Sequence, residues 1–362
     1  MSLVPTWSRA PGGAPAVLAI ADSAPRARMS AMMLGDLPDA GGAMGLAVLR
    51  SADTPSPDRI RAALEGTRHA GRRIPLLTAG QVRKLIRRRR PDAVLLNCSG
   101  PHIEALSWSS RPFLRRYRPV VVSALPVPGL PASEGEWLHR SRVDLLVAHS
   151  HREVDEYTVL GEKLGLKGRV GLAGLYPDRD DPYTGGPRDR VVFAARPGLP
   201  AGTLGCEALL LALARLAADR PDLDVVLHIG EEGHPELIEV LAALVASAGV
   251  PRTALTVETG PLRDRLDRAR GVAALGSVPI LEAIAARVPS LVLTDFGVGW
   301  DQGNVVFEGS GLFGDLTDLR ACRFHKPSRA WGERNHFHPP SHDDWAAHLY
   351  ELCGRAGRGT LA

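Results

Sequence analysis

The sequence predicts an α/β protein built on two parallel β-sheets with helices on both faces. Short apolar runs alternate with amphipathic segments at intervals of about 25–35 residues, which is the pattern of strands joined by helical crossovers. A polar segment rich in Pro and Gly, residues 178–189, interrupts this pattern near the middle of the chain. The 362 residues also exceed what one hydrophobic core usually organises, so we expect two domains.

The first predicted domain covers residues 14–177. Its apolar runs are the expected strands: 16–21, 45–49, 93–97, 119–123 and 145–148. Helices are expected between them: 25–37, 57–69, 79–90, 101–108 and 152–164. Pro91 ends the third helix, because the residue before a proline avoids the helical conformation.

The second predicted domain covers residues 190–340. Its expected strands are 190–195, 225–229, 254–257, 271–275 and 291–293. Its expected helices are 203–219, 235–248, 262–268 and 277–288. The terminal segment, 341–362, contains a helix at 343–353 that can cross back onto the first domain.

The stretch 271–297 is the centre of the functional argument. A buried strand ends at the small turn Gly276-Ser277, where Ser277 is a good N-cap and Pro279 falls in the first helical turn. The exposed N–H groups of such a helix can hold a phosphate, and Glu282, one turn further on, can reach a sugar hydroxyl or the turn backbone. The alternative is an ordinary strand–turn–helix connection without a ligand.

Composition restricts the class of protein. The net charge of +4 and a pI near 9.0 fit an anionic ligand or membrane surface without requiring nucleic acid. No apolar run reaches the roughly 18 residues of a membrane span, and the first fifteen residues lack the apolar centre of a signal peptide. Four scattered cysteines without a CxxC pair indicate a reduced cytoplasmic protein with no structural zinc.

The densest charge in the chain runs from Lys84 to Arg90 (KLIRRRR). It lacks the interleaved aromatic residues of a nucleic-acid module, so we interpret it as a solvated helix face. The alternative is peripheral contact with the anionic inner face of a membrane, where a lipid-linked acceptor would lie. Four histidines near the C-terminus match no metal-binding spacing and are interpreted as a solvated loop: His325, His336, His338 and His342.

The second half resembles the C-terminal domain of GT-B glycosyltransferases. The resemblance rests on the small turn, on Glu282-Ala283 within the following helix and on Pro289 before the next strand. It implies two Rossmann-like domains that face each other across a cleft, with the acceptor bound by the first and a nucleotide-sugar donor by the second. It also implies that Arg196 lies near the donor phosphates and that Gly260 holds the donor base through its backbone.

His234-Pro235 resembles the His-Pro motif of sialyl- and capsule-type transferases that use CMP-sugars, and implies that His234 contacts a phosphate. The donor turn departs from that group, which commonly has Ser-Ser or Ser-Thr there. More narrowly, the chain resembles an actinobacterial group of glycosyltransferases of unassigned specificity. The resemblance is carried by Ala21-Asp22-Ser23 and by the stretches 148–153, 292–297 and 306–313.

A glycosyltransferase needs a base for the acceptor hydroxyl, and three residues of the first domain are candidates. Asp22 ends the first strand, where ligands of α/β folds bind; the alternative is a helix-capping or turn aspartate. His149 and His151 follow another strand as further candidates, and Ser150 and Glu153 between them form a capping box. In the second domain, sugar hydroxyls are expected at Asp295, Gln302 and Asn304.

We therefore predict a metal-independent glycosyltransferase without a cofactor, acting in polysaccharide biosynthesis. Its donor would be a CMP- or UDP-activated sugar and its acceptor a glycan, a lipid-linked molecule or a small molecule. A nucleotide-sugar 2-epimerase of the same fold is one alternative. A non-catalytic relative that binds a nucleotide or a glycan is another, because a second donor-site glutamate is missing.

Overall fold

The computed structural model describes residues 14–37, 44–51, 54–108, 117–176, 187–230, 233–247, 250–251 and 254–361. Most of the expected linker, 178–189, lies outside these residues. The chain forms two compact units. The first consists of Met1–Leu175 together with Pro339–Ala362, and the second of Tyr176–His338.

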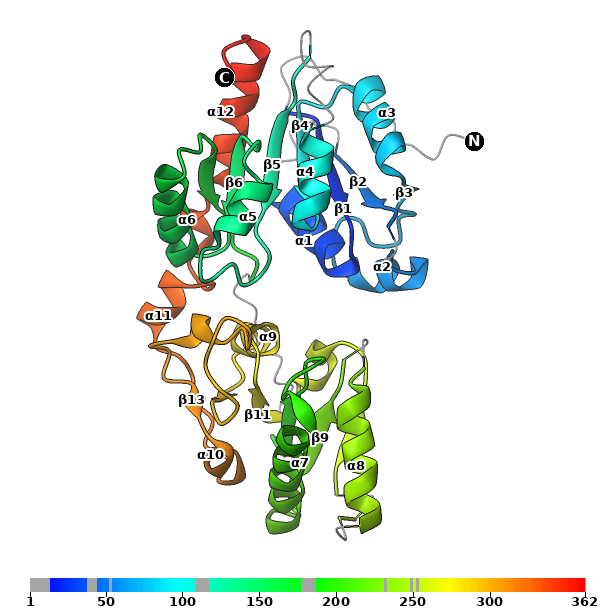
Figure 1. The fold of residues 1–362 in the computed structure, drawn as a ribbon, viewed down its shortest axis with the longest axis vertical. Coiled ribbons are helices and arrows are strands. Elements are labelled where there is room, and N and C mark those ends of the chain that lie inside the picture. The colour runs from blue at the N-terminus through cyan, green and yellow to red at the C-terminus, as the bar shows by residue number, and fades with distance from the viewer. Residues whose placement is uncertain are drawn as a thin grey trace. The chain divides into compact units, whose positions relative to one another are not determined.

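The first unit contains a seven-stranded parallel sheet in the order β3-β2-β1-β4-β5-β6-β7. Its strands are β1 (Val17–Ala21), β2 (Met44–Leu49), β3 (Leu76–Leu77), β4 (Ala93–Asn97), β5 (Val120–Ala124), β6 (Leu145–Ala148) and β7 (Arg169–Leu172). Its helices are α1 (Ala24–Asp36), α2 (Pro57–Ala63), α3 (Ala79–Arg89), α4 (Gly100–Trp108), α5 (Glu134–His139), α6 (His151–Lys163), the 3₁₀ helix η4 (Pro340–His342) and α12 (Trp345–Gly357). Figure 1 shows this sheet with its helices.

Hydroxyl side chains fix the starts of most of these helices. An Oγ atom accepts the N–H of the residue three positions later, which satisfies one of the unpaired donors of the first turn. These caps are Ser23, Ser56, Thr78, Ser133 and Ser150. The predicted starts of α1, α2, α3 and α6 lie within one residue of the observed starts, whereas α5, which Ser133 caps, was not predicted.

The first sheet is buried on both faces. Helices α1 and α12 pack on one face. There Met33 and Leu34 of α1 and Leu349 of α12 share a hydrophobic core with the side chains of β1 at positions 17, 19 and 21. The other face packs against α3, α4, α5 and α6 through residues such as Val82, Ile103, Trp137 and Tyr157. This two-sided burial accounts for the nearly continuous apolar runs of the strands.

The second unit contains a six-stranded parallel sheet in the order β10-β9-β8-β11-β12-β13. Its strands are β8 (Arg190–Ala194), β9 (Asp224–His228), β10 (Thr256–Glu258), β11 (Ala269–Ala274), β12 (Ser290–Leu293) and β13 (Phe313–Gly314). Its helices are α7 (Gly202–Asp219), α8 (Pro235–Ser247), η2 (Leu262–Arg265), α9 (Ser277–Ala285), η3 (Val305–Phe307), α10 (Leu316–Arg320) and α11 (Arg329–Arg334). Helices α7, α8 and α10 share one buried cluster with the strands.

The predicted fold class is confirmed: both units are Rossmann-like α/β folds with parallel sheets, as in GT-B enzymes. Each strand order reverses once. In the first sheet β1 lies between β2 and β4, and in the second β8 lies between β9 and β11. Ligands of such sheets bind outside the carboxyl ends of the strands at this reversal, called the topological switch point.

Several predicted elements differ from the structure. Helix α2 ends at Ala63 rather than at residue 69, and Gly66 in the following turn has a positive φ of 73°. The expected helix 262–268 is the shorter 3₁₀ helix η2. The sequence pattern also missed three short strands, β3, β7 and β13, and the short helices α5, α10 and α11, because two to six residues show no clear periodicity.

The terminal helix α12 belongs to the first unit. It packs against β5, β6 and β7, and Trp345 at its start is only 2 % exposed within the core on that face of the sheet. The Asp344 carboxylate accepts the N–H of Leu172 at 2.7 Å, which fixes the helix start to β7. A segment distant in sequence therefore completes the first hydrophobic core.

Replacing Trp345 by Ala should destabilise the first unit by about 3–5 kcal/mol, because it removes a large fully buried side chain. Hydrogen exchange should show loss of protection in β5, β6 and β7, while the second sheet keeps its protection. The control is Trp300→Ala, since Trp300 is 78 % exposed and its removal should leave exchange in both sheets unchanged. Equal loss of protection in both sheets would contradict this assignment.

Candidate functional site

Asp22 is the centre of the polar site at the switch point of the first sheet. It follows β1, and its carboxylate accepts three hydrogen bonds from two neighbouring connections. The guanidinium of Arg26 donates to Oδ1 at 2.8 Å, and the N–H of Ser99, which follows β4, donates to Oδ2 at 2.7 Å. His102 Nδ1 lies 2.9 Å from the same Oδ2.

The hydrogen bonds of Asp22 determine its charge. Burial raises the pKa of Asp22, but the hydrogen bonds from His102, Ser99 and Arg26 outweigh burial and lower this pKa to about 2. The carboxylate is thus ionised at neutral pH and a weak base. The prediction that Asp22 itself takes the acceptor proton is therefore not supported by its environment.

His102 is the functional candidate that the sequence analysis missed. An ionised carboxylate only accepts, so Nδ1 of His102 carries a hydrogen and donates it to Asp22, and Nε2 is the other ring nitrogen. The side chain is 37 % exposed, and within the described residues no group hydrogen-bonds Nε2. The signal was available in Ser99-Gly100-Pro101-His102, a turn directly after β4, once β4 is known to pair with β1.

The two predicted histidines of the β6–α6 connection do not join this site. His149 is fully buried, and its Nδ1 lies 2.9 Å from the carbonyl oxygen of Ala173, so the ring cannot meet a substrate. His151 starts α6, and its Nε2 lies 3.0 Å from Nδ1 of His342. The predicted cap at Ser150 is present, but the Glu153 carboxylate accepts the N–H groups of His149 and Gly129.

Arg196 and Gly276 meet at the switch point of the second sheet. Arg196 follows β8, and Gly276 follows β11 and is the N-cap of α9 without a side-chain cap bond. A Cβ atom on Gly276 would lie 3.3 Å from Cδ of Arg196, so the glycine allows the Arg196 side chain to lie across the helix start. Ser277 is the first helical residue rather than the predicted N-cap, because Gly276 keeps an extended backbone.

Gln302 completes this group. Its carbonyl oxygen accepts from Nη1 of Arg196 at 3.4 Å, and its side-chain Oε1 is buried without a hydrogen-bond partner among the described residues. A buried acceptor without a partner costs free energy, which a hydrogen-bond donor on a ligand would recover. Arg196, the N–H groups of α9 and Gln302 together provide a cation, a positive helix end and an acceptor.

Two other predicted sugar ligands have structural roles. Asn304 is fully buried and closes its own loop, with Oδ1 accepting from Gly299 at 3.0 Å and Nδ2 donating to Gly297 at 3.1 Å. Asp295 is exposed after β12, and its carboxylate accepts the N–H of Leu316 at 3.0 Å, at the start of α10. The prediction is therefore not supported for Asn304, which is fully buried and hydrogen-bonds its own loop.

His234 does not have the role implied by the His-Pro resemblance. Its Nδ1 accepts the N–H of Leu237 at 3.2 Å, so Nε2 carries the hydrogen and donates to the carbonyl of Leu199 at 3.1 Å. Both ring nitrogens are used and the residue is 3 % exposed, so none remains for a phosphate. His234 instead fixes the start of α8, where Pro235 is the first residue.

Gly260 and Glu282 lie where the sequence predicted, in the connection after β10 and in α9. Gly260 has a positive φ of 98°, and its carbonyl accepts from Nε2 of His228 at 2.8 Å. His228 ends β9 and so fixes the loop expected to hold the donor base. Glu282 is half-buried, one turn inside α9.

Of the four C-terminal histidines predicted to lie in a solvated loop, His325 and His342 are exposed but His336 and His338 are buried. His336 is 1 % and His338 7 % exposed, and the His336 ring packs against Tyr176 with 6.3 Å between ring centroids.

Across the described ranges, no three His, Cys, Asp or Glu side chains are grouped to hold a metal ion. Every helix in the part of the chain that the structure describes is too short or too polar to cross a membrane.

Solved structures with the same fold include several nucleotide-sugar enzymes. The S. aureus MnaA–UDP co-structure has a TM-score of 0.60 and 14 % identity over 96 % of this chain and 97 % of that chain. The UDP-GlcNAc 2-epimerase of Neisseria meningitidis bound to UDP-GlcNAc has a TM-score of 0.52 and 12 % identity over 94 % and 100 %. A Polygonum tinctorium UDP-glucosyltransferase has a TM-score of 0.51 and 14 % identity over 97 % and 96 %. At these identities the similarity establishes the fold.

The family follows from the sequence itself. The family model described as "Putative glycosyltransferase (DUF6716)" matches residues 17–352, and the chain belongs to this family. No curated protein sequence matches the chain significantly. The matched region contains Asp22, His102, Arg196, Gly276 and Gln302, so both switch-point sites lie within the family domain.

The low pKa of Asp22 predicts a pH-dependent contribution to stability. A pKa lowered from 3.8 to about 2 stabilises the folded state by about 2 kcal/mol above pH 4, and this contribution is lost as the pH falls towards 2. Asp22→Asn should therefore reduce the free energy of unfolding of the first unit at pH 6, and the difference from wild type should shrink by pH 2. Denaturant unfolding followed by hydrogen exchange measures both values.

Asp58→Asn is the matched control, because the Asp58 side chain is 81 % exposed beside Arg61. Its effect on the unfolding free energy should be close to zero at both pH values. A pH-independent effect of Asp22→Asn would contradict the charged hydrogen-bonded state of Asp22.

Proposed function

We propose that this protein is a metal-independent glycosyltransferase that takes a sugar from a nucleotide-sugar donor. The second unit binds the donor phosphates, and the first unit removes the proton of the acceptor hydroxyl. The observation that carries the proposal is the polar group at each switch point, Asp22–His102 in the first sheet and Arg196–Gly276–Gln302 in the second. Membership of the glycosyltransferase family supports the same reaction class.

The donor half rests on positive charge. When the bond between sugar and phosphate breaks, its electrons move to the phosphate oxygen. The guanidinium of Arg196 and the N–H groups at the start of α9 stabilise that negative charge without a metal ion. Gln302 Oε1 accepts a hydroxyl hydrogen of the donor sugar and so orients the sugar.

The acceptor half rests on His102. Its Nε2 takes the proton of the acceptor hydroxyl while the hydroxyl oxygen forms a bond to the anomeric carbon of the sugar. Asp22 is a positioning residue. It holds the Nδ1–H tautomer at 2.9 Å, and its negative charge stabilises the imidazolium ion that forms.

The choice of donor nucleotide now favours UDP over CMP. The prediction of a CMP-sugar rested on His234, whose two nitrogens are used within the protein. Two proteins of similar fold support UDP. S. aureus MnaA was solved with UDP, and the Polygonum tinctorium protein is a UDP-glucosyltransferase. A nucleotide-sugar 2-epimerase stays an alternative because the N. meningitidis epimerase has this fold.

Calorimetric titration with UDP, CMP, GDP and TDP should find UDP as the tightest ligand. Arg196→Gln should weaken UDP binding at least tenfold, because a hydrogen bond to a charged group contributes about 1.5–3 kcal/mol. The control is Arg215→Gln, which removes an exposed arginine of α7 and should leave UDP affinity unchanged. If no nucleotide binds below millimolar concentration, the proposed donor site is wrong.

His102→Gln should reduce turnover about 10²- to 10⁴-fold with little change in nucleotide affinity, because it removes the general base but not the phosphate site. Asp22→Asn should also reduce turnover and shift the pH profile of kcat, since the imidazolium loses its counter-charge. The comparison variant is His151→Gln. If His151→Gln loses turnover and His102→Gln keeps full turnover, His151 rather than His102 is the general base.

The same assays separate the alternatives. The wild-type protein incubated with UDP-N-acetylglucosamine alone should not form the 2-epimer, and accumulation of the epimer would favour the epimerase. A protein that binds UDP but neither transfers nor hydrolyses any UDP-sugar would be the non-catalytic relative.

A further inference from the structure

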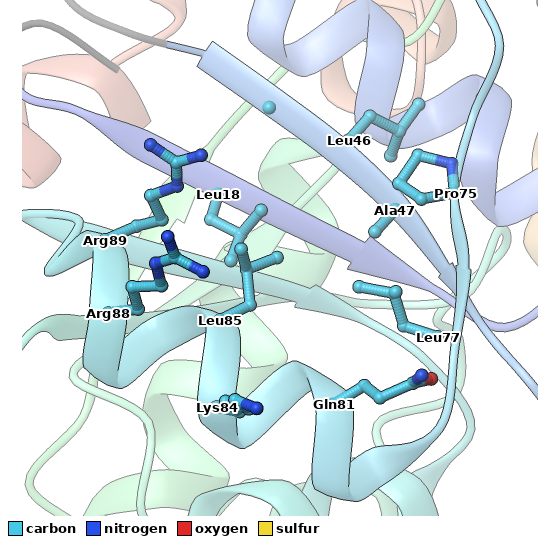
Figure 2. A pocket seen from close by; sticks show the side chains of 11 residues that line it. Leu18, Leu46, Ala47, Pro75, Leu77, Gln81, Lys84, Leu85, Arg88 and Arg89 are labelled. Atoms are coloured by element: carbon cyan, nitrogen blue, oxygen red, sulfur yellow. The ribbon is translucent and has the colours of Figure 1, made fainter. Parts of the chain in front are cut away.

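A hollow of about 170 Å³ lies between α3 and the edge of the first sheet, distinct from the switch-point site. Its walls are almost entirely apolar, and they come from β1, β2, α3 and the segment that leads into β3. The apolar lining residues are Leu18, Leu46, Ala47, Pro75, Leu77 and Leu85. Figure 2 shows these side chains around the hollow, with Arg88 and Arg89 at one end and Gln81 near the other.

The hollow exists because β3 is very short. Only Leu76 and Leu77 pair with β2, opposite Val48 and Leu49. The earlier residues of β2 pair with β1 on one side, but on the β3 side no strand lies beside them within the described part of the chain. A longer β3 would place further side chains under α3. With the short β3, the space between α3 and β2 stays partly empty. Leu46 and Ala47 belong to this part of β2, and both line the hollow.

Three cations border this apolar hollow: Lys84, Arg88 and Arg89. They share one helix, α3, and among the described residues none of them forms an ion pair with a carboxylate. In the part of the chain that the structure describes, the buried Nε–H of Arg89 also has no hydrogen-bond acceptor. A buried donor left unpaired costs free energy, and a phosphate oxygen would satisfy it.

We propose that this hollow is a binding site for an anionic membrane phospholipid. The phosphate lies on Arg88 and Arg89, and part of one acyl chain enters the apolar hollow. Arginine pairs bind phosphate well because their N–H groups match its oxygens. The volume suits a short stretch of chain, since an apolar cavity of about 150 Å³ takes one benzene.

Helix-end electrostatics alone do not account for this arrangement. Basic residues are common in the last turn of a helix because they interact favourably with its negative end. Arg87, Arg88 and Arg89 all lie in the last turn of α3. The tendency does not explain why Arg88 and Arg89 border an apolar hollow, or why the buried Nε of Arg89 has no acceptor among the described residues. An apolar cavity with cations at one end has the chemistry of an amphiphile with an anionic head.

The test compares binding to phosphatidylcholine vesicles with and without phosphatidylglycerol, by co-sedimentation of the full chain. Wild-type protein should bind only the anionic vesicles. Arg88→Gln with Arg89→Gln should weaken binding more than twentyfold, since each basic residue at an anionic surface contributes about fivefold. Arg83→Gln with Arg87→Gln is the matched control, because it removes the same charge from α3 outside the hollow and should weaken binding less.

A second variant tests the apolar part. Leu85→Gln keeps the charge but places an amide in the hollow, and it should weaken binding of decyl phosphate measured by calorimetry. Inorganic phosphate should bind far more weakly than decyl phosphate to the wild-type protein. Unchanged melting temperatures show that the variants are folded.

Three results would overturn the proposal: no binding to anionic vesicles, equal loss of vesicle binding in the two double variants, or equal affinity for inorganic and decyl phosphate. The second result would indicate diffuse attraction by the whole basic helix, and the third a simple anion site. Neither assay uses a nucleotide or an acceptor. Failure here is therefore distinguishable from failure of the proposed transferase function.

Discussion

The buried carboxylate of Asp22 is the interaction on which the first site depends. It joins two connections, β1–α1 and β4–α4, that are separated by almost eighty residues of sequence, because Arg26 and Ser99 both donate to it. A buried carboxylate is tolerated only when such donors compensate for lost hydration. The same donors that keep Asp22 charged leave it a poor base, and the proposed base is its third partner, His102.

At the switch point of the second sheet, the polar groups are held in place by space beside a glycine rather than by a buried carboxylate. Here the helix N-terminus is not capped by a side chain, and Gly276 leaves space for Arg196 to lie over it. A side chain at position 276 would meet Arg196 directly. The absence of a Cβ atom therefore matters more than the N-capping hydroxyl that the sequence suggested at the next residue.

The fold could be predicted from the sequence because buried parallel strands and capped helices leave local patterns. Those patterns do not contain the strand order, and the strand order decides which connections meet. His102 was missed for this reason, since its partner Asp22 is eighty positions away. His234 was misassigned for a related reason: a motif gives the residue type, but the use of both ring nitrogens by Leu199 and Leu237 appears only in three dimensions.

The two halves of the proposed reaction follow one electrostatic rule. Transfer creates positive charge on the base and negative charge on the departing phosphate, and a fixed group of opposite sign stabilises each. Asp22 is the fixed anion for the imidazolium of His102, and Arg196 with the start of α9 is the fixed cation for the phosphate. Hydrogen bonds within each unit hold Asp22 and Arg196 before any ligand binds, so little reorganisation accompanies the charge separation. Two preorganised sites of opposite charge are what a transfer without a metal ion requires.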